Sequence, residues 1–125
     1  MSDLAKKFQI KPAMKGGAFR CPKDVSLPFP SLANLKRKEL DYLIVFVKSA
    51  ADIAKFAEPA LSVLREDGIL WFSYPKKTGS IPTDISRDLA WKPVTDLGFD
   101  GCRQIAIDDT WSSLRFREPR FSRKS

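Results

Sequence analysis

The chain has 125 residues, with 22 Lys and Arg against 15 Asp and Glu, two Cys and no His. Its length predicts a single domain over residues 1–125, and a hydrophobic share of 43% is enough to bury one core, which excludes a wholly disordered chain. The missing histidine excludes every Ser-His-Asp, Cys-His and His-metal arrangement that one chain could supply alone.

The cysteines and the N-terminal sequence predict the compartment. Cys21 and Cys102 are too few for a disulfide scaffold and are typical of reduced thiols. Residues 1–11 lack the apolar run of a signal peptide, and no stretch approaches the ~20 apolar residues of a membrane helix. We therefore expect a cytoplasmic protein without a membrane partner.

The net charge of +7 is concentrated at the two ends of the chain. Residues 1–23 carry +5 and residues 115–125 carry +4, whereas residues 24–114 carry −2. Residues 118–125 are predicted to form a basic, flexible tail. Such a tail suits phosphate contact and base stacking, but we favour a solvated tail over nucleic-acid binding, because a basic tail alone is nonspecific.

The first part of the chain predicts two strands separated by a proline-rich connection. Two glycines precede a short strand at residues 17–21, and three prolines in residues 22–34 disfavour regular structure there. A basic turn of helix is expected near residues 32–40. Residues 42–47 form an unbroken apolar run, which predicts a strand buried on both faces.

The middle of the chain predicts a helix followed by a second buried strand. Ser49 stands where an N-cap belongs, and apolar residues recur at helical spacing up to Leu64, with Pro59 expected to kink the helix. Residues 65–68 end in the glycine expected at a helix C-terminus. Residues 69–74 are again apolar, so strand, helix and strand predict two parallel strands.

The last third predicts a loop, a helix and an antiparallel hairpin. The loop covers residues 75–82, and Thr83 or Asp84 is expected to cap a helix that runs to Leu97. The predicted hairpin consists of residues 103–107, an Asp-rich turn at 108–111 and residues 112–117. Together, the predicted elements indicate a three-layer, Rossmann-like α/β fold. Its short and mostly parallel sheet ends in the antiparallel hairpin.

This order of elements resembles the second half of a class I S-adenosylmethionine-dependent methyltransferase, where an apolar fourth strand, a helix, an apolar fifth strand, a helix and two last strands follow one another. The segments "IKPAMKGG", "ILWFSYPKKTGSIPTDI" and "IDDTWSSLRF" are also similar to a small, uncharacterised family of compact bacterial proteins. The resemblance implies a bacterial protein with a reduced, methyltransferase-like topology.

The chain departs from the methyltransferase pattern where the cofactor binds. That family follows its first strand with a Gly-rich turn, whereas the segment after the first predicted strand, Cys21–Asp24, has no glycine. Too few residues remain before Tyr42 for the helices and strands of a complete cofactor-binding half. We therefore expect that this half is lacking and that no cofactor is bound.

Polar residues after the predicted parallel strands form a candidate site. Ligands of open α/β sheets bind outside the carboxyl ends of the strands, and three strand ends are each followed by lysine. Ser49 and the following helix would add donors for an anion. The predicted ligand is small and anionic or phosphate-bearing; the competing interpretation is that these are ordinary solvated lysines. The candidate residues are Lys23, Lys48, Ser49, Lys76, Lys77, Thr78, Ser80 and Asp109.

Other polar groups favour structural roles. Asp108 and Asp109 are more typical of turn hydrogen bonds than of a cation site, although Asp109 is a candidate ion-pair partner for Lys76 or Lys77. Both cysteines are interpreted as ordinary small residues, because no histidine is available to activate them. We thus predict no catalytic residues and no metal.

The function expected from the sequence is that of an uncharacterised protein without catalytic activity that binds a small anionic ligand. One alternative is an S-adenosylmethionine-dependent methyltransferase with an altered or partner-completed cofactor site. A second alternative is nucleic-acid association through the basic termini. An open sheet edge would also favour a homodimer.

Overall fold

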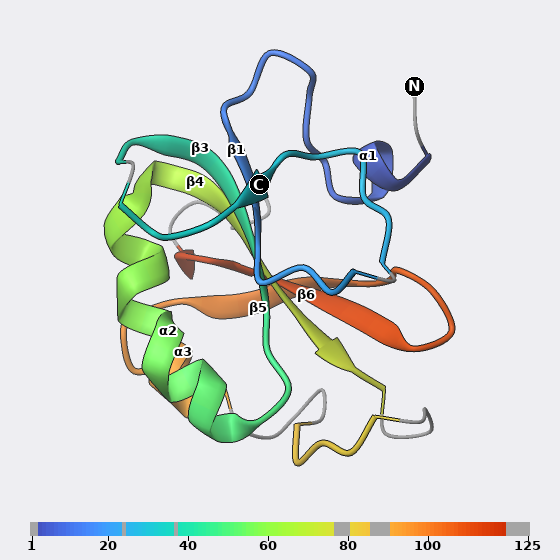
Figure 1. Cartoon of the computed structure of the whole chain (residues 1–125). Coiled ribbons are helices and arrows are strands. Elements are labelled where there is room, and N and C mark those ends of the chain that lie inside the picture. Colours follow the sequence, from blue (N-terminus) through green and yellow to red (C-terminus); the bar gives the residue numbers. More distant parts are fainter. Residues whose placement is uncertain (1–2, 24, 37, 77–80, 86–90, 120–125) are drawn as a thin grey trace.

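The protein, described here from a computed structural model, folds around one six-stranded sheet (Figure 1). The structure describes residues 3–23, 25–36, 38–76, 81–85 and 91–119. The strands lie in the order β2-β1-β3-β4-β6-β5. Strands β2, β1, β3 and β4 are parallel, whereas β6 and β5 are antiparallel to their neighbours. The strands are β1 (Gly16–Phe19), β2 (Ser31–Leu32), β3 (Leu40–Phe46), β4 (Leu64–Pro75), β5 (Asp100–Ala106) and β6 (Trp111–Arg117).

This architecture confirms the predicted α/β fold with a mostly parallel sheet and an antiparallel end. The apolar runs at 42–47 and 69–74 pair side by side within β3 and β4, where Tyr42 is opposite Ile69. Their side chains alternate between the two faces of the sheet, and both faces are buried, as an unbroken apolar run predicts. The predicted hairpin is also present as β5 and β6.

Helices cover one face of the sheet. Helix α2 (Ala50–Val63) buries a stripe at helical spacing, Ile53, Ala57, Ala60 and Val63, and α3 (Lys92–Thr95) contacts it on the same side. Ser49 is the N-cap, as predicted. Figure 1 shows α2 and α3 together on one side of the sheet and α1 (Asp3–Lys7) on the other.

Irregular chain covers most of the second face. Phe8, directly after α1, is fully buried there, and its carbonyl accepts a hydrogen bond of 3.0 Å from the Trp71 indole. Val25 and Phe29, from the connection between β1 and β2, pack into the same cluster. The third layer is therefore present, but loops and one five-residue helix form it.

The helix expected near residues 32–40 is not found in the described residues. Instead, β2 pairs with β1, and the described part of the connection after it is irregular. The connection must return from the end of β2 to the start of β3 while passing β1, a sideways shift of two strand spacings, or about 10 Å. It must also return along the sheet from the level of Val45, which Leu32 shares through Phe19, to Leu40, a further distance of about 16 Å. Seven helical residues would advance only about 10 Å in total, which is less than these two displacements together, so a helix could not make this connection.

Two glycines lie within β1 rather than before it, so the strand begins one residue earlier than predicted and ends at Phe19. A Cβ atom on Gly16 would lie 2.1 Å from the Tyr42 carbonyl oxygen. A Cβ on Gly17 would lie 2.6 Å from the Pro30 carbonyl oxygen. Both positions therefore require glycine for the close approach of neighbouring backbone.

Residues 65–68 do not cap α2, which is a second correction. The helix ends at Val63, and the chain passes directly into β4. Leu64 pairs with Leu40 and Ile69 pairs with Tyr42, so residues 65–68 form a bulge opposite Asp41. Asp67, not Gly68, takes the left-handed conformation, with φ of 56°. Side chains from other strands hold the bulge: Asp41 binds Arg65, and Arg117 binds Asp67.

Of the helix expected from residue 83 or 84 to Leu97, the described residues include only α3. Residues 81–85 are not helical, and residues 86–90 lie outside the described part of the chain. Pro93 stands at the start of α3, where proline is tolerated. Asp84 instead accepts from the Ala50 N–H, a donor that has no acceptor within α2, and the Thr83 hydroxyl donates to the Lys48 carbonyl just before the helix.

Candidate functional site

The order of the strands defines where a ligand site is expected. The chain steps from β1 to β2 in one direction and from β3 to β4 in the other, so the sheet has a switch point between β1 and β3. The carboxyl edge, defined here as residues 20–23, 47–49 and 76, follows strands β1, β3 and β4. Helix α2 begins at this edge, directly after Ser49, and its first backbone N–H groups are the donors that helix N-termini offer to anions.

Residues of α2 itself satisfy part of its N-terminus. The Ser49 hydroxyl accepts a hydrogen bond of 3.3 Å from the Asp52 N–H. In return, the Asp52 carboxylate accepts one of 2.9 Å from the Lys48 N–H. This pair resembles a capping box, except that the Asp52 carboxylate accepts from the N–H of Lys48, the residue before the N-cap, rather than from the N-cap Ser49.

A segment far along the chain satisfies the next donor. The Asp84 carboxylate accepts a hydrogen bond of 2.8 Å from the Ala50 N–H. The Thr83 hydroxyl donates one of 2.7 Å to the Lys48 carbonyl and accepts one of 3.1 Å from the Ile85 N–H. Two carboxylates of the protein therefore occupy donors that an external anion would otherwise use.

Arg20 connects the end of β1 to this helix. Its guanidinium lies 3.6 Å from an Asp52 carboxylate oxygen and 4.7 Å from the centre of the Phe56 ring. The positive charge of Arg20 offsets the negative charge of Asp52, so their ion pair spans the switch point from β1 to α2. The Arg20 guanidinium is therefore paired with a carboxylate and a ring of the protein itself.

The structure places the described lysines of the predicted site along the carboxyl edge. Lys23 and Lys48 are exposed, and Lys76 is half-buried. Among the described residues, no ion pair involves the ammonium group of any of the three. The three residues follow β1, β3 and β4, which are adjacent and parallel; that they form one ligand site stays a prediction. Three further candidates, Lys77, Thr78 and Ser80, lie outside the described residues.

The turn after β5 lies beside Lys76. Pro75 pairs with Trp111, and the Lys76 N–H donates a hydrogen bond of 2.8 Å to the Thr110 carbonyl. Asp108 closes the turn by accepting 2.8 Å hydrogen bonds from two backbone N–H groups, so the predicted turn role of the acidic pair is confirmed for Asp108. Asp109 is exposed, and within the described part it has no ion pair with Lys76.

Sequence reasoning missed Arg20, Asp52 and Asp84. The pattern Ser49-x-x-Asp52 is a local signal for the capping box and could have identified Asp52. Asp84 carries no such signal, because the residue that it binds lies 34 positions earlier in the chain.

The two carboxyl groups with lowered pKa values, Asp41 and Asp67, lie at the opposite end of the parallel strands, around the bulge in β4. Hydrogen bonds from Arg117 hold the pKa of Asp67 below its usual value. The Lys15 backbone N–H, with Arg65, lowers the pKa of Asp41. These groups clamp the bulge to neighbouring segments, so their shifts have a structural cause. Among the described residues, no cluster of three or more acidic or thiol side chains is arranged to hold a metal.

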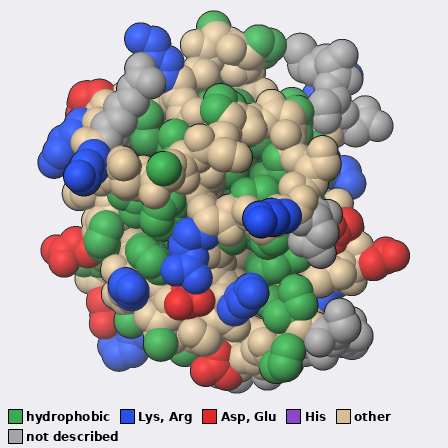
Figure 2. All heavy atoms as spheres, viewed as in Figure 1, with side chains coloured by type: hydrophobic (Ala, Val, Ile, Leu, Met, Phe, Trp, Pro, Cys, Tyr) green, Lys and Arg blue, Asp and Glu red, His purple; other side chains and the backbone are tan. Residues whose placement is uncertain are grey.

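Positively and negatively charged side chains are mixed on the surface in view. Figure 2 shows Lys and Arg side chains interspersed with Asp and Glu on the face in view, rather than gathered into one patch. No helix within the described residues combines the length and the apolar character that crossing a membrane requires.

Comparison with known proteins supports the fold alone. No protein-family model and no curated protein sequence matches the chain. A Sulfolobus solfataricus structure described as a type 11 methyltransferase is similar at 13% identity and a TM-score of 0.52, over 70% of this chain and 57% of that one. The N-methyltransferase NodS from Bradyrhizobium japonicum is similar at 14% identity and a TM-score of 0.47, over 71% of this chain and 59% of its own. The chain thus has a methyltransferase-like α/β fold and spans less than two thirds of either structure.

Methyltransferases of this fold bind S-adenosylmethionine, and the residues at the switch point do not fit that group. The segment directly after β1 is Arg20, Cys21 and Pro22, with no glycine to admit a ligand to the backbone. The left-handed position there belongs to Arg20, with φ of 68°. Its side chain extends to Asp52, and therefore fills space beside the switch point.

Proposed function

We propose that the protein is a non-catalytic, ligand-binding relative of the methyltransferase fold, and that its ligand is a small anionic or phosphate-bearing molecule. The observation that supports this proposal is that Asp52, Asp84 and Arg20 bond to groups of the protein itself at the switch point, an arrangement that we call internal closure. Closure leaves the side chains of the carboxyl edge, above all Lys48 and Lys76, as the groups that contact an anion.

The mode of binding follows from these groups. Exposed ammonium groups hold an anion without the backbone donors of α2, so the affinity is modest and decreases as salt concentration rises. The nearby carboxylates of Asp52 and Asp84 oppose an approaching anion. The site is therefore suited to reversible binding of a small ligand rather than to tight retention.

The alternative function is an S-adenosylmethionine-dependent methyltransferase whose cofactor site is altered or is completed by a partner chain. The fold supports this alternative, because the similar Sulfolobus solfataricus structure is described as a type 11 methyltransferase. Nucleic-acid binding through the termini and a homodimer stay predictions, and residues 120–125 of the tail lie outside the described part of the chain.

Calorimetric titration with inorganic pyrophosphate and with adenosylhomocysteine separates the two functions. We expect pyrophosphate to bind and the double variant Lys48→Ala/Lys76→Ala to weaken binding about fivefold to tenfold. The matched control is Lys36→Ala/Lys38→Ala, which removes the same charge from exposed positions before β3 and should leave the affinity unchanged.

A third variant tests the role of internal closure. Asp84→Asn removes a negative charge and keeps an oxygen that can accept from the Ala50 N–H, so the affinity for pyrophosphate should rise about twofold to fivefold. Binding of adenosylhomocysteine in preference to pyrophosphate would contradict the proposal and favour the methyltransferase. Equal effects of the two double variants would show that only net charge matters, and would also refute the site.

A further inference from the structure

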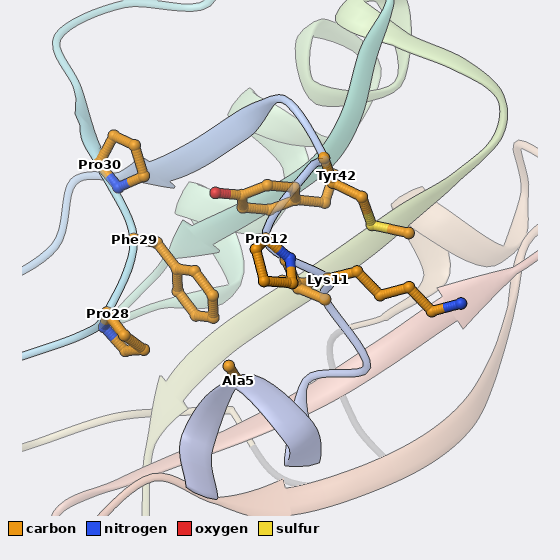
Figure 3. A pocket seen from close by; sticks show the side chains of 9 residues that line it. Ala5, Lys11, Pro12, Pro28, Phe29, Pro30 and Tyr42 are labelled. Atoms are coloured by element: carbon orange, nitrogen blue, oxygen red, sulfur yellow. The ribbon is translucent and has the colours of Figure 1, made fainter. Parts of the chain in front are cut away.

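A cavity lies far from the carboxyl edge, on the face of the sheet that loops cover (Figure 3). Its volume is about 310 Å³. Tyr42 stands near the start of β3, Pro30 directly precedes β2, and Ala5 belongs to α1, so the cavity opens at the amino ends of the parallel strands. Nothing in the proposed anion site contributes to it.

Rigid residues hold the cavity open. Three of its lining residues are prolines, whose restricted backbone disfavours collapse of the two loops. The Phe29 ring is anchored against Phe8 and Tyr42, at centroid distances of 5.5 Å in both cases. Gly16 leaves room for the Tyr42 ring, because a Cβ there would lie 2.8 Å from a ring carbon. The walls are therefore preformed for a flat apolar ligand.

The Tyr42 hydroxyl is a polar group without an assigned partner. The side chain is only 3% exposed, and its hydroxyl makes no hydrogen bond with the described residues. Arg115 Nε is the only polar side-chain atom of the described residues that is fully buried without a partner, so the Tyr42 oxygen is accessible from the cavity and available to a ligand. Burial also raises the pKa of the phenol, which keeps it protonated and able to donate at neutral pH. Figure 3 shows the hydroxyl on the Pro30 side of the cavity.

The charge around the cavity favours an anion. Lys11 lines the cavity, and Figure 3 shows its ammonium group extending to the side away from Pro30. An adjoining hollow of about 270 Å³ shares Lys11 with the cavity and adds Lys6. The described lining of the two hollows contains both lysines and no acidic residue. Their apolar stems can line the walls while the ammonium groups stay in water.

We propose that this cavity binds a small aromatic carboxylate with a polar substituent on the far side of its ring. The ring lies among Phe29, Pro12 and Tyr42, the carboxylate reaches Lys11, and the substituent hydrogen-bonds with the Tyr42 hydroxyl. The volume is at the lower end of the range of about 300–1,000 Å³ for small-molecule sites, which limits the ligand to a single ring.

Three matched ligands and two variants test each contact, with NMR titration as the measurement. The ligands are para-hydroxyphenylacetate, phenylacetate, which lacks the hydroxyl, and para-hydroxyphenylacetamide, which lacks the charge. We expect Tyr42→Phe to weaken only the two hydroxylated ligands, about threefold to tenfold, and to leave the melting temperature unchanged because the hydroxyl has no internal partner. We expect Lys11→Ala to weaken only the two acids, about twofold to fivefold.

A third variant tests the cavity itself. Ala5→Leu keeps a strong helix former in α1 and fills the cavity, so binding of all three ligands should be lost while the circular dichroism spectrum is retained. Unchanged binding in folded Ala5→Leu would overturn the proposal, as would the absence of saturable binding by para-hydroxyphenylacetate. Amide shifts at Lys48 and Lys76 instead of Ala5 and Met14 would also overturn it and would place the ligand at the carboxyl edge.

Discussion

At the residue scale, charged side chains mainly join segments that are distant in the sequence. Arg117 donates two 2.8 Å hydrogen bonds to the Asp67 carboxylate, across 50 positions of the chain. This bidentate pair holds the bulge of β4 against the end of β6, and both side chains are about three quarters buried. It therefore contributes more than an exposed ion pair would.

The Asp67–Arg117 pair predicts an acid-dependent loss of stability. Arg117 lowers the pKa of Asp67 in the folded protein below the ordinary value of 3.8, so the stabilisation is complete above that value and is lost as the pH falls through the lowered pKa. Asp67→Asn keeps a residue that tolerates the left-handed backbone and removes the charge.

We expect this variant to lower the free energy of unfolding by about 1 kcal/mol at pH 7. The difference in the free energy of unfolding between the variant and the natural protein should decrease toward zero at acidic pH. Urea titrations at several pH values would measure it. Asp96→Asn is the control, because Asp96 pairs with Lys92 only at the exposed surface of α3 and should cost less than about 0.5 kcal/mol. A difference that persists undiminished at low pH would contradict the role of the charge.

At the element scale, the start of α2 depends on side chains at its own first turn and on a distant loop. Ser49, predicted as a ligand-binding residue, is the N-cap of the helix. Asp84 and Thr83 bind the same turn from outside the helix. Groups of the protein itself therefore accept from the Ala50 and Asp52 N–H groups at the start of α2.

We expect removal of the Ser49 cap to lower the stability of the folded protein measurably. Ser49→Ala leaves the Asp52 N–H without its side-chain acceptor, and should lower the free energy of unfolding by about 1 kcal/mol. Ser62→Ala is the control on the same helix, since the Ser62 hydroxyl only donates to the Pro59 carbonyl at the exposed surface. Equal stabilities of the two variants in urea titration would show that the cap contributes nothing.

Elements were predictable from the sequence where their signals are local. The apolar runs of β3 and β4 and the stripe of α2 identify these elements, and strand ends located Lys48 and Lys76 at one edge. The strand β2 has two residues and exists because Gly17 admits the neighbouring backbone. No pattern within so short a segment could predict it.

At the scale of the whole molecule, the two faces of the sheet are covered by different kinds of structure. Helices α2 and α3 cover one face, whereas α1 and the connection after β1 cover the other (Figure 1). Phe8 is central to the second cover, with edge-to-face contacts to Phe29 and Trp71 at 5.5 and 5.0 Å. The N-terminal residues are therefore part of the core.

This packing predicts a large effect of truncating Phe8. Phe8→Ala should lower the free energy of unfolding by about 3–5 kcal/mol, because a fully buried ring is replaced by a cavity between loop and sheet. Leu97→Ala is the matched control: Leu97 is 42% exposed, and its truncation should cost less than about 0.5 kcal/mol. Similar melting temperatures for the two variants would show that the N-terminal segment does not stabilise the sheet.

The sequence by itself determined the class of fold, because apolar runs, helical spacing and turn residues act over a few neighbouring positions. It also determined that the chain has no histidine-dependent chemistry and that lysines follow three of the strands. Only the tertiary structure decided that Asp84 and Arg20 converge on the start of α2. Only it decided that loops at the far end of the sheet enclose a cavity beside Tyr42. Both features join residues 30 or more positions apart, and their contacts exist only once the sheet has formed.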